Sequence, residues 1–283
     1  MTGVRRAADL VALTRLMSCA AAAGEVLLGA HLARGDLGVA RRPVAVACVA
    51  VLLIAAAGNV ANDLHDVPVD TLNKPWRPLP SGRMSGREAA VLALAMAVTG
   101  MALAWTLGPA MGAVATGLAV LAVGYSTHLK GTVLLGNATV ALVAASPVLY
   151  GAQVNGGLSA SAGMAWSIVF LFMGALEVLK TVADREADAR VRLVTVATRL
   201  GAGRALRVVH GLLLLYTLVA LAPVPLGLAR NGYTPAMLFS TVVPVIVAQA
   251  IVHRRHGEQP IRMALWVLRG AWFPGLLTLG LLR

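Results

Sequence analysis

The chain has 283 residues, of which 58% are hydrophobic and only 13% are charged. Globular proteins carry charge on about a quarter of their residues, so this composition excludes a soluble domain, and its hydrophobicity excludes a disordered chain. The net charge of +12 would suggest nucleic-acid binding in a soluble protein. In so apolar a chain it instead indicates that Lys and Arg gather on the cytoplasmic side of a membrane. We expect a polytopic protein of the lipid bilayer with no nucleic-acid partner.

Nine apolar runs are long enough, at about 20 residues, to cross a bilayer as helices. They are rich in Ala and Leu and lack the alternation of barrel strands, which predicts an all-α fold. No linker or second soluble segment stands out, so we expect residues 1–283 to form a single domain. The predicted spans are Val11–Ala33, Pro43–Asn62, Ala89–Leu107, Pro109–Thr127, Thr132–Ala152, Ala160–Leu179, Ala205–Leu221, Pro235–Val252 and Met263–Leu282.

The distribution of positive charge predicts the orientation. If the N-terminus is cytoplasmic, most Lys and Arg residues outside the runs fall on the cytoplasmic side, as the positive-inside rule requires. Arg34, Arg41 and Arg42, in the first loop, are exceptions. Arg5 and Arg6 precede the first run as in a signal peptide, but this run is long enough to span, which favours an uncleaved helix. We expect a protein of the inner cell membrane with a cytoplasmic N-terminus.

Half of the 12 acidic residues fall in two short segments, 63–70 and 184–188, each following a predicted span. In the first segment, Asn62, Asp66 and Asp70 have the spacing i, i+4, i+8, which places them on one face of a helix. Pro68 would clash with a carbonyl of the preceding turn. We therefore expect the helix to kink or end near Val67, with Asp70 presented from a helix or from a turn.

The second segment repeats this spacing with Asp184 and Asp188, and Lys180 lies one turn earlier. Carboxylate oxygens suit Mg²⁺, which is usually shared with substrate phosphates. One such pair alone is most simply a set of solvated loop charges. Two pairs on the same side of a membrane favour a divided magnesium site that bridges a diphosphate, because acids at membrane depth are costly and generally functional.

Cations accompany both segments. Lys74, Arg77 and Arg83 lie in a Pro-rich and Gly-containing stretch that predicts an ordered turn, and Lys130 closes the fourth run. These side chains are suited to phosphate oxygens that are not bound to metal. The alternative is that they serve topology and contact lipid headgroups.

Taken together, these motifs resemble the UbiA superfamily of intramembrane prenyltransferases. The first acidic segment matches the pattern NDxxDxxxD and is followed by NxPxRPLPSG at residues 73–82. The second matches DxxxD and is followed by TxxxxLG at residues 195–201. The stretch YSxxLK at residues 125–130, followed by Gly136 and Asn137, also fits. The resemblance covers nearly the whole chain.

The resemblance implies nine helices around a central cavity and transfer of an isoprenyl group from an isoprenyl diphosphate to a hydrophobic acceptor, through an allylic carbocation. Thr181 and Ala183 stand where many relatives carry acids, which leaves the number of ligands in the second motif open. Because Pro68 affects how Asp70 is presented, we rank Asp66, Asp184 and Asp188 as catalytic, above Asp70. The implied Mg²⁺ ligands are Asn62, Asp66, Asp70, Asp184 and Asp188, and the implied diphosphate-binding residues are Lys130, Arg77, Tyr125, Lys180 and Arg15.

Other functions remain as alternatives. A terpene cyclase of the same fold would ionise the diphosphate and cyclise it without an acceptor. A CDP-alcohol phosphotransferase would need a D-G…A-R…G arrangement, which this chain lacks. A transporter would be expected to carry charged residues within interrupted membrane helices. The charged residues within the predicted spans of this chain are scattered and form no such arrangement. The sequence leaves open whether the acceptor is a lipid or an aromatic compound, and how long the donor chain is.

Overall fold

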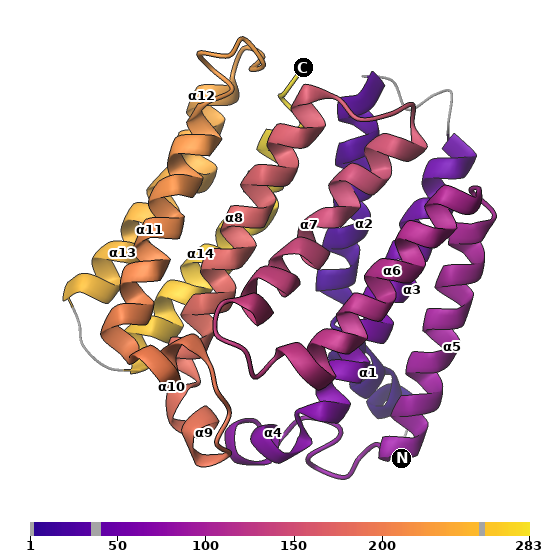
Figure 1. The fold of residues 1–283 in the computed structure, drawn as a ribbon, viewed down its shortest axis with the longest axis vertical. Helices are drawn as coiled ribbons and strands as arrows, with labels where there is room; N and C mark the ends of the chain where they lie inside the picture. Colours follow the sequence, from indigo (N-terminus) through magenta and orange to yellow (C-terminus); the bar gives the residue numbers. More distant parts are fainter. Residues whose placement is uncertain (1–2, 35–40, 255–257) are drawn as a thin grey trace.

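The computed structural model describes residues 3–34, 41–254 and 258–283, and all regular elements in these ranges are helices (Figure 1). The isolated bridge between Ala229 and Leu282 is the sole strand-like pairing within them. The predicted all-α class is confirmed. The helices are α1 (Gly3–Thr14), α2 (Leu16–Arg34), α3 (Arg41–His65), α4 (Val67–Asn73), α5 (Gly86–Trp105), α6 (Pro109–Gly124), the π-helical turn η1 (Tyr125–Leu129), α7 (Leu135–Val154), α8 (Ala160–Ala183), α9 (Arg185–Arg190), α10 (Val196–Leu200), α11 (Ala202–Leu221), α12 (Tyr233–Met237), the π-helical turn η2 (Leu238–Val242), α13 (Val243–Arg254) and α14 (Glu258–Leu279).

The long helices lie side by side, and the short helices α4, α9 and α10 gather at one end of the molecule (Figure 1). The N-terminus lies at this same end and the C-terminus at the opposite end. We call the end that carries α4 and α9 the acidic end, because both aspartate segments lie there.

In the described ranges, 8 helices are long and apolar enough to cross a membrane. The protein is therefore an integral membrane protein with multiple spans. The ninth predicted span falls on α14, which is helical but is not among the eight, because Arg262 and Arg269 make it less apolar. The eight are Leu16–Arg34, Arg41–His65, Gly86–Trp105, Pro109–Leu129, Leu135–Val154, Ala160–Ala183, Ala202–Leu221 and Tyr233–His253.

The first predicted span is broken, which the sequence analysis did not foresee. Val11–Ala33 was expected to be one helix, but α1 ends at Thr14 and α2 begins at Leu16. Arg15 between them has a φ of 53°, in the left-handed region that costs a non-glycine residue free energy. Its guanidinium pairs with Asp63 of α3, and this contact compensates for the unfavourable backbone.

Helices α2 and α7 cross closely because small residues lie at the crossing. A Cβ at Gly29 would lie 1.8 Å from the Val148 carbonyl oxygen, and one at Gly151 would lie 2.0 Å from that of Val26. Contacts of this kind let helix backbones pack tightly where the hydrophobic effect between helices is absent. The crossing fixes α2 against α7 and, through α7, against α8.

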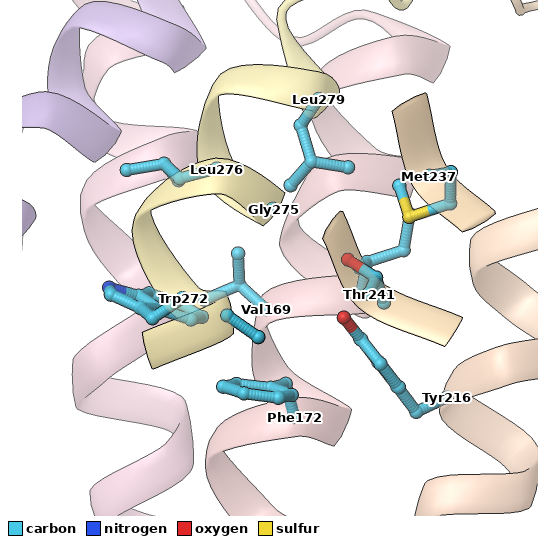
Figure 2. A pocket seen from close by; sticks show the side chains of 11 residues that line it. Val169, Phe172, Tyr216, Met237, Thr241, Trp272, Gly275, Leu276 and Leu279 are labelled. Atoms are coloured by element: carbon cyan, nitrogen blue, oxygen red, sulfur yellow. The ribbon is translucent and has the colours of Figure 1, made fainter. Parts of the chain in front are cut away.

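The largest apolar core extends over α8, α11, α13 and α14. It contains an apolar pocket lined by Phe172, Tyr216 and Trp272, among others (Figure 2). Phe172 stacks on Trp272 with ring centroids 5.2 Å apart. The pocket extends to Leu279 at the far end of α14, so it lies away from the acidic end.

Candidate functional site

The two aspartate segments have the same local structure. In each, a long helix ends, one aspartate stands at the junction, and a short helix carries the next aspartate one turn later. Asp66 lies between α3 and α4, and Asp184 lies between α8 and α9. The helical hydrogen bonds continue through both junctions, from the Asp70 N–H to the Asp66 carbonyl at 2.7 Å and from the Asp188 N–H to the Asp184 carbonyl at 2.9 Å. The predicted kink or end of the helix near Val67 is confirmed, and Asp70 is presented from a helix and not from a turn.

Asp66 is held by side chains from two directions. Nδ2 of Asn62 donates to its Oδ2 at 2.9 Å, which confirms that these residues share a helix face. Lys130 forms an ion pair with its Oδ1. Lys130 directly follows η1, and a π-helical turn of this kind is frequent at functional sites. Lys130, the last residue of the YSxxLK stretch, thus contacts the first aspartate motif.

A loop after α4 directs Arg77 back toward the first motif. Arg77 Nη1 donates to Asp70 Oδ2 at 2.6 Å and to Asp63 Oδ1 at 3.2 Å. Arg15 also pairs with Asp63, and Lys74 lies 3.5 Å from Asp70. Asp63 and Asp70 are almost fully buried, with side-chain exposures of 5% and 4%, so this cationic cover is what makes their charges tolerable. Asp70, expected as a ligand together with Asp66, pairs with Arg77 and Lys74.

The loop itself is ordered, as its sequence predicts. The Arg77 and Ser81 N–H groups donate to carbonyls of this loop, and Met84 N–H donates back to Pro78. Gly82 has a φ of 70°, which suits glycine in the turn. These bonds fix the backbone that carries Arg77.

The second motif carries less positive charge. Asp184 lies 3.7 Å from Arg262, and Asp188 is buried at the start of α9. Burial and the neighbouring Asp184 carboxylate raise the pKa of Asp188 to about 6. This pair is therefore a place where a further cation would be strongly stabilised.

The two motifs face one another at the acidic end. Helix α4 packs against α9. Asp66, Lys130 and Lys74, from the first half of the chain, act electrostatically on Asp188. Tyr125 of η1 lies within electrostatic range of both motifs, since Asp66 and Asp188 both act on its hydroxyl. Lys180, expected to bind the diphosphate, pairs with Glu177 on the preceding turn of α8.

The donor set fits Mg²⁺ by its chemistry. In the part of the chain that the structure describes, no three His, Cys, Asp or Glu side chains gather closely enough to hold an ion by themselves. Mg²⁺ does not require such a cage, because proteins bind it through one or two carboxylates together with substrate phosphates and water. The Asn62–Asp66 and Asp184–Asp188 pairs each offer that number of oxygen ligands.

Two residues of this region were not predicted as site residues. Asp63 was noted only as part of the acidic segment, yet Arg15 and Arg77 both contact it. Glu177 was not singled out, although it lies seven residues before Asp184 and three before Lys180. The helical spacing from Glu177 and Lys180 on α8 to Asp184 at its C-terminal end places the three on neighbouring turns of one helix face, and this was the signal available in the sequence.

In this helical membrane protein two aspartate motifs face each other, and Lys and Arg side chains pair with their carboxylates. Such a site is suited to binding an anionic substrate at the membrane surface. The model of the UbiA prenyltransferase family matches residues 16–269. The chain therefore belongs to the UbiA prenyltransferase family, and it is a prenyltransferase.

The similar curated proteins include several archaeal enzymes of one activity. Digeranylgeranylglyceryl phosphate synthase of Methanopyrus kandleri is 38% identical over 85% of this chain and 86% of its own length. The enzyme of the same name from Natronomonas pharaonis is 33% identical over 93% of each chain.

Solved structures share the fold. A structure of digeranylgeranylglyceryl phosphate synthase in membranes matches with a TM-score of 0.75 and 21% identity, covering 98% of each chain. A UbiA homologue from Archaeoglobus fulgidus bound to GPP and Mg²⁺ matches with a TM-score of 0.67 and 16% identity, covering 96% of this chain and 99% of that one. At these identities the likeness establishes the fold alone.

Proposed function

We propose that this prenyltransferase transfers a geranylgeranyl group from geranylgeranyl diphosphate to the free hydroxyl of geranylgeranylglyceryl phosphate, forming an ether. The observation that carries the proposal is the similarity, at 38% identity over 85% of the chain and 33% identity over 93% of it, to two digeranylgeranylglyceryl phosphate synthases. The same comparison favours a lipid acceptor over an aromatic one. The apolar chains of both substrates suit a site that opens onto membrane helices.

Mg²⁺ would be held by Asn62, Asp66, Asp184 and Asp188, and when bound it would neutralise charge that builds up on the leaving diphosphate. Asp70 is a weaker candidate ligand, because two cations, Arg77 and Lys74, cover it, whereas Asp66 pairs with Lys130 alone. The excess of carboxylate charge around Asp188 supports this assignment.

The protein's own cations would bind the diphosphate. Lys130 sits on Asp66 and Arg77 sits on Asp63 and Asp70, so their donors already point into the acidic end. Arg15 and Tyr125 line the same region. Phosphate oxygens that accept hydrogen bonds from these groups would be oriented with the prenyl carbon toward the apolar helices, where water that could quench a carbocation is scarce.

For the topology we propose nine spans around a central cavity, with the acidic end cytoplasmic. The N-terminus and the C-terminus lie at opposite ends of the molecule, which supports an odd number of crossings and α14 as the ninth span (Figure 1). The positive-inside rule supports the cytoplasmic assignment of the acidic end.

The test is product formation by the purified protein in detergent with Mg²⁺. We expect the diether product, detected by mass spectrometry, with both substrates present and no cyclic hydrocarbon with the donor alone. Asp184→Asn should reduce turnover by at least 100-fold, whereas Glu186→Gln, at an exposed position two residues from each proposed ligand and on the other side of the helix, should not. A cyclic product from the donor alone would instead support the terpene cyclase, and full activity of Asp184→Asn would overturn the metal assignment.

A further inference from the structure

Glu177 lies on α8, on the membrane side of the second aspartate motif. It precedes Asp184 by seven residues, so the two share a helix face and lie about 10 Å apart along the axis. Its side chain is only 12% exposed and pairs with Lys180. The metal and diphosphate roles proposed above leave this carboxylate without a function.

Tyr125 faces Glu177 from the other side of the site. The ring of Tyr125 rests on Gly136 of α7, where a Cβ would lie 3.3 Å from it, and Gly174 of α8 faces Ala141 of α7 at 3.9 Å. Because α7 and α8 are antiparallel, a rise of about 1.5 Å per residue from that contact places Gly136 level with the Glu177–Lys180 turn. Glu177 is one of the charged groups close enough to act electrostatically on the Tyr125 hydroxyl.

The depth of Glu177 matches the depth at which the reaction must occur. A diphosphate held at the acidic end would direct its C1 atom toward the membrane, and the acceptor oxygen must approach C1 from beyond it. The acids nearer the cytoplasmic surface are covered by Arg77, Arg15 and Lys130 or are proposed metal ligands. Glu177 is on the membrane side of all of them.

Two other acids on the long helices, Glu25 and Glu88, lie in unsuitable places. Glu25 lies midway along α2, ten residues after Arg15. It is therefore about 15 Å along the helix axis from the level of the Arg15–Asp63 ion pair. Glu88 is exposed at the start of α5, where it accepts hydrogen bonds from Ser85. Neither can reach a hydroxyl at the level of C1.

We propose that Glu177 is the general base that accepts the proton of the acceptor hydroxyl. The inference rests on the function proposed above. As the acceptor oxygen bonds to C1, the C1–O bond to the diphosphate breaks and the diphosphate leaves with the electron pair. The hydroxyl proton goes to the Glu177 carboxylate. Lys180 holds this carboxylate in place through their ion pair.

The test compares Glu177→Gln with wild type and with Glu88→Gln, which makes the same change at an exposed site. General-base catalysis contributes about 10²–10⁴-fold, so we expect kcat of Glu177→Gln to fall by that factor with the donor KM unchanged within about twofold. Glu88→Gln should retain wild-type kcat. An acceptor analogue with fluorine beside the carbinol carbon has a more acidic hydroxyl and should recover at least tenfold of the loss in Glu177→Gln.

The outcomes separate the two proposals. If wild type forms no diether product, the proposed function fails. If wild type is active and Glu177→Gln has the same kcat, or if the fluorinated acceptor recovers none of its loss, the assignment of Glu177 is overturned while the proposed function stands. An equal loss of donor affinity and of kcat would show a structural role and would also overturn it. Glu177→Asp, which keeps the carboxylate, should retain more activity than Glu177→Gln.

Discussion

Arg77 connects two buried carboxylates that no other single residue joins in the described part of the chain. Its Nη1 atom lies 2.6 Å from Asp70 Oδ2 and 3.2 Å from Asp63 Oδ1. Arg77→Gln removes the charge but keeps a polar side chain of similar length. Asp63 then keeps Arg15, and Asp70 keeps Lys74 at 3.5 Å. We expect the folded protein to be destabilised even when no substrate is bound.

The size of the effect follows from the geometry. A hydrogen bond to a charged group contributes about 1.5–3 kcal/mol, and two such bonds are lost. The Arg77 side chain is 25% exposed and two other cations remain, so we take the lower part of the range and expect a loss of about 3 kcal/mol. For a chain of this size each kcal/mol shifts Tm by about 2–4 °C, which predicts a decrease of about 6–12 °C.

The assay is thermal unfolding of the purified protein in detergent, without substrate. The exposed Arg87 provides the control, since Arg87→Gln makes the same change and should alter stability by no more than about 0.5 kcal/mol. Asp70→Asn should be coupled to Arg77→Gln by about 1–2 kcal/mol in a double-mutant cycle. Effects that add within about 0.5 kcal/mol, or equal Tm values for the two Arg variants, would refute the reasoning.

Three further predictions concern the helix crossing and the site. Gly29→Ala places a Cβ 1.8 Å from a backbone carbonyl and should sharply lower the yield of folded protein on size-exclusion chromatography, unlike Gly163→Ala, which meets nothing within 4 Å. Gly136→Ala places a Cβ 2.6 Å from a carbonyl of η1 and should reduce kcat more than Tm, because the turn that precedes Lys130 must shift; equal relative losses would contradict this. Asp188→Asn removes a proposed magnesium ligand and should raise the Mg²⁺ concentration needed for half-maximal activity at least tenfold, and an unchanged Mg²⁺ titration would exclude that role.

The sequence predicted much of the fold because lipid imposes a simple requirement on it. A chain that crosses a bilayer must satisfy its backbone hydrogen bonds within helices, so long apolar runs could be assigned to helices without knowledge of their packing. The break at Arg15 could not be predicted in this way. It depends on a contact with Asp63, 48 residues later in the chain, which compensates for a backbone conformation that local preference disfavours.

The sequence also identified most of the residues at the candidate site, because spacing along a helix is a local property. The pairs Asn62–Asp66 and Asp184–Asp188 follow from one helical turn. Their partners do not. Only the packing of α4 against α9, and the return of Arg77 and Lys130 to the acidic end, decide which cation pairs with which carboxylate.

Composition and helical period thus determined by themselves that this protein is a helical membrane protein with two equivalent aspartate segments. The tertiary structure decided how similar acids differ: Asp70 is neutralised by Arg77, Asp188 is buried beside Asp184 with a raised pKa, and Glu177 is set deeper beside Lys180. The physical reason is that the electrostatic energy of a carboxylate depends on its burial and on the charges within a few ångströms of it. Those neighbours come from helices that are distant in the sequence.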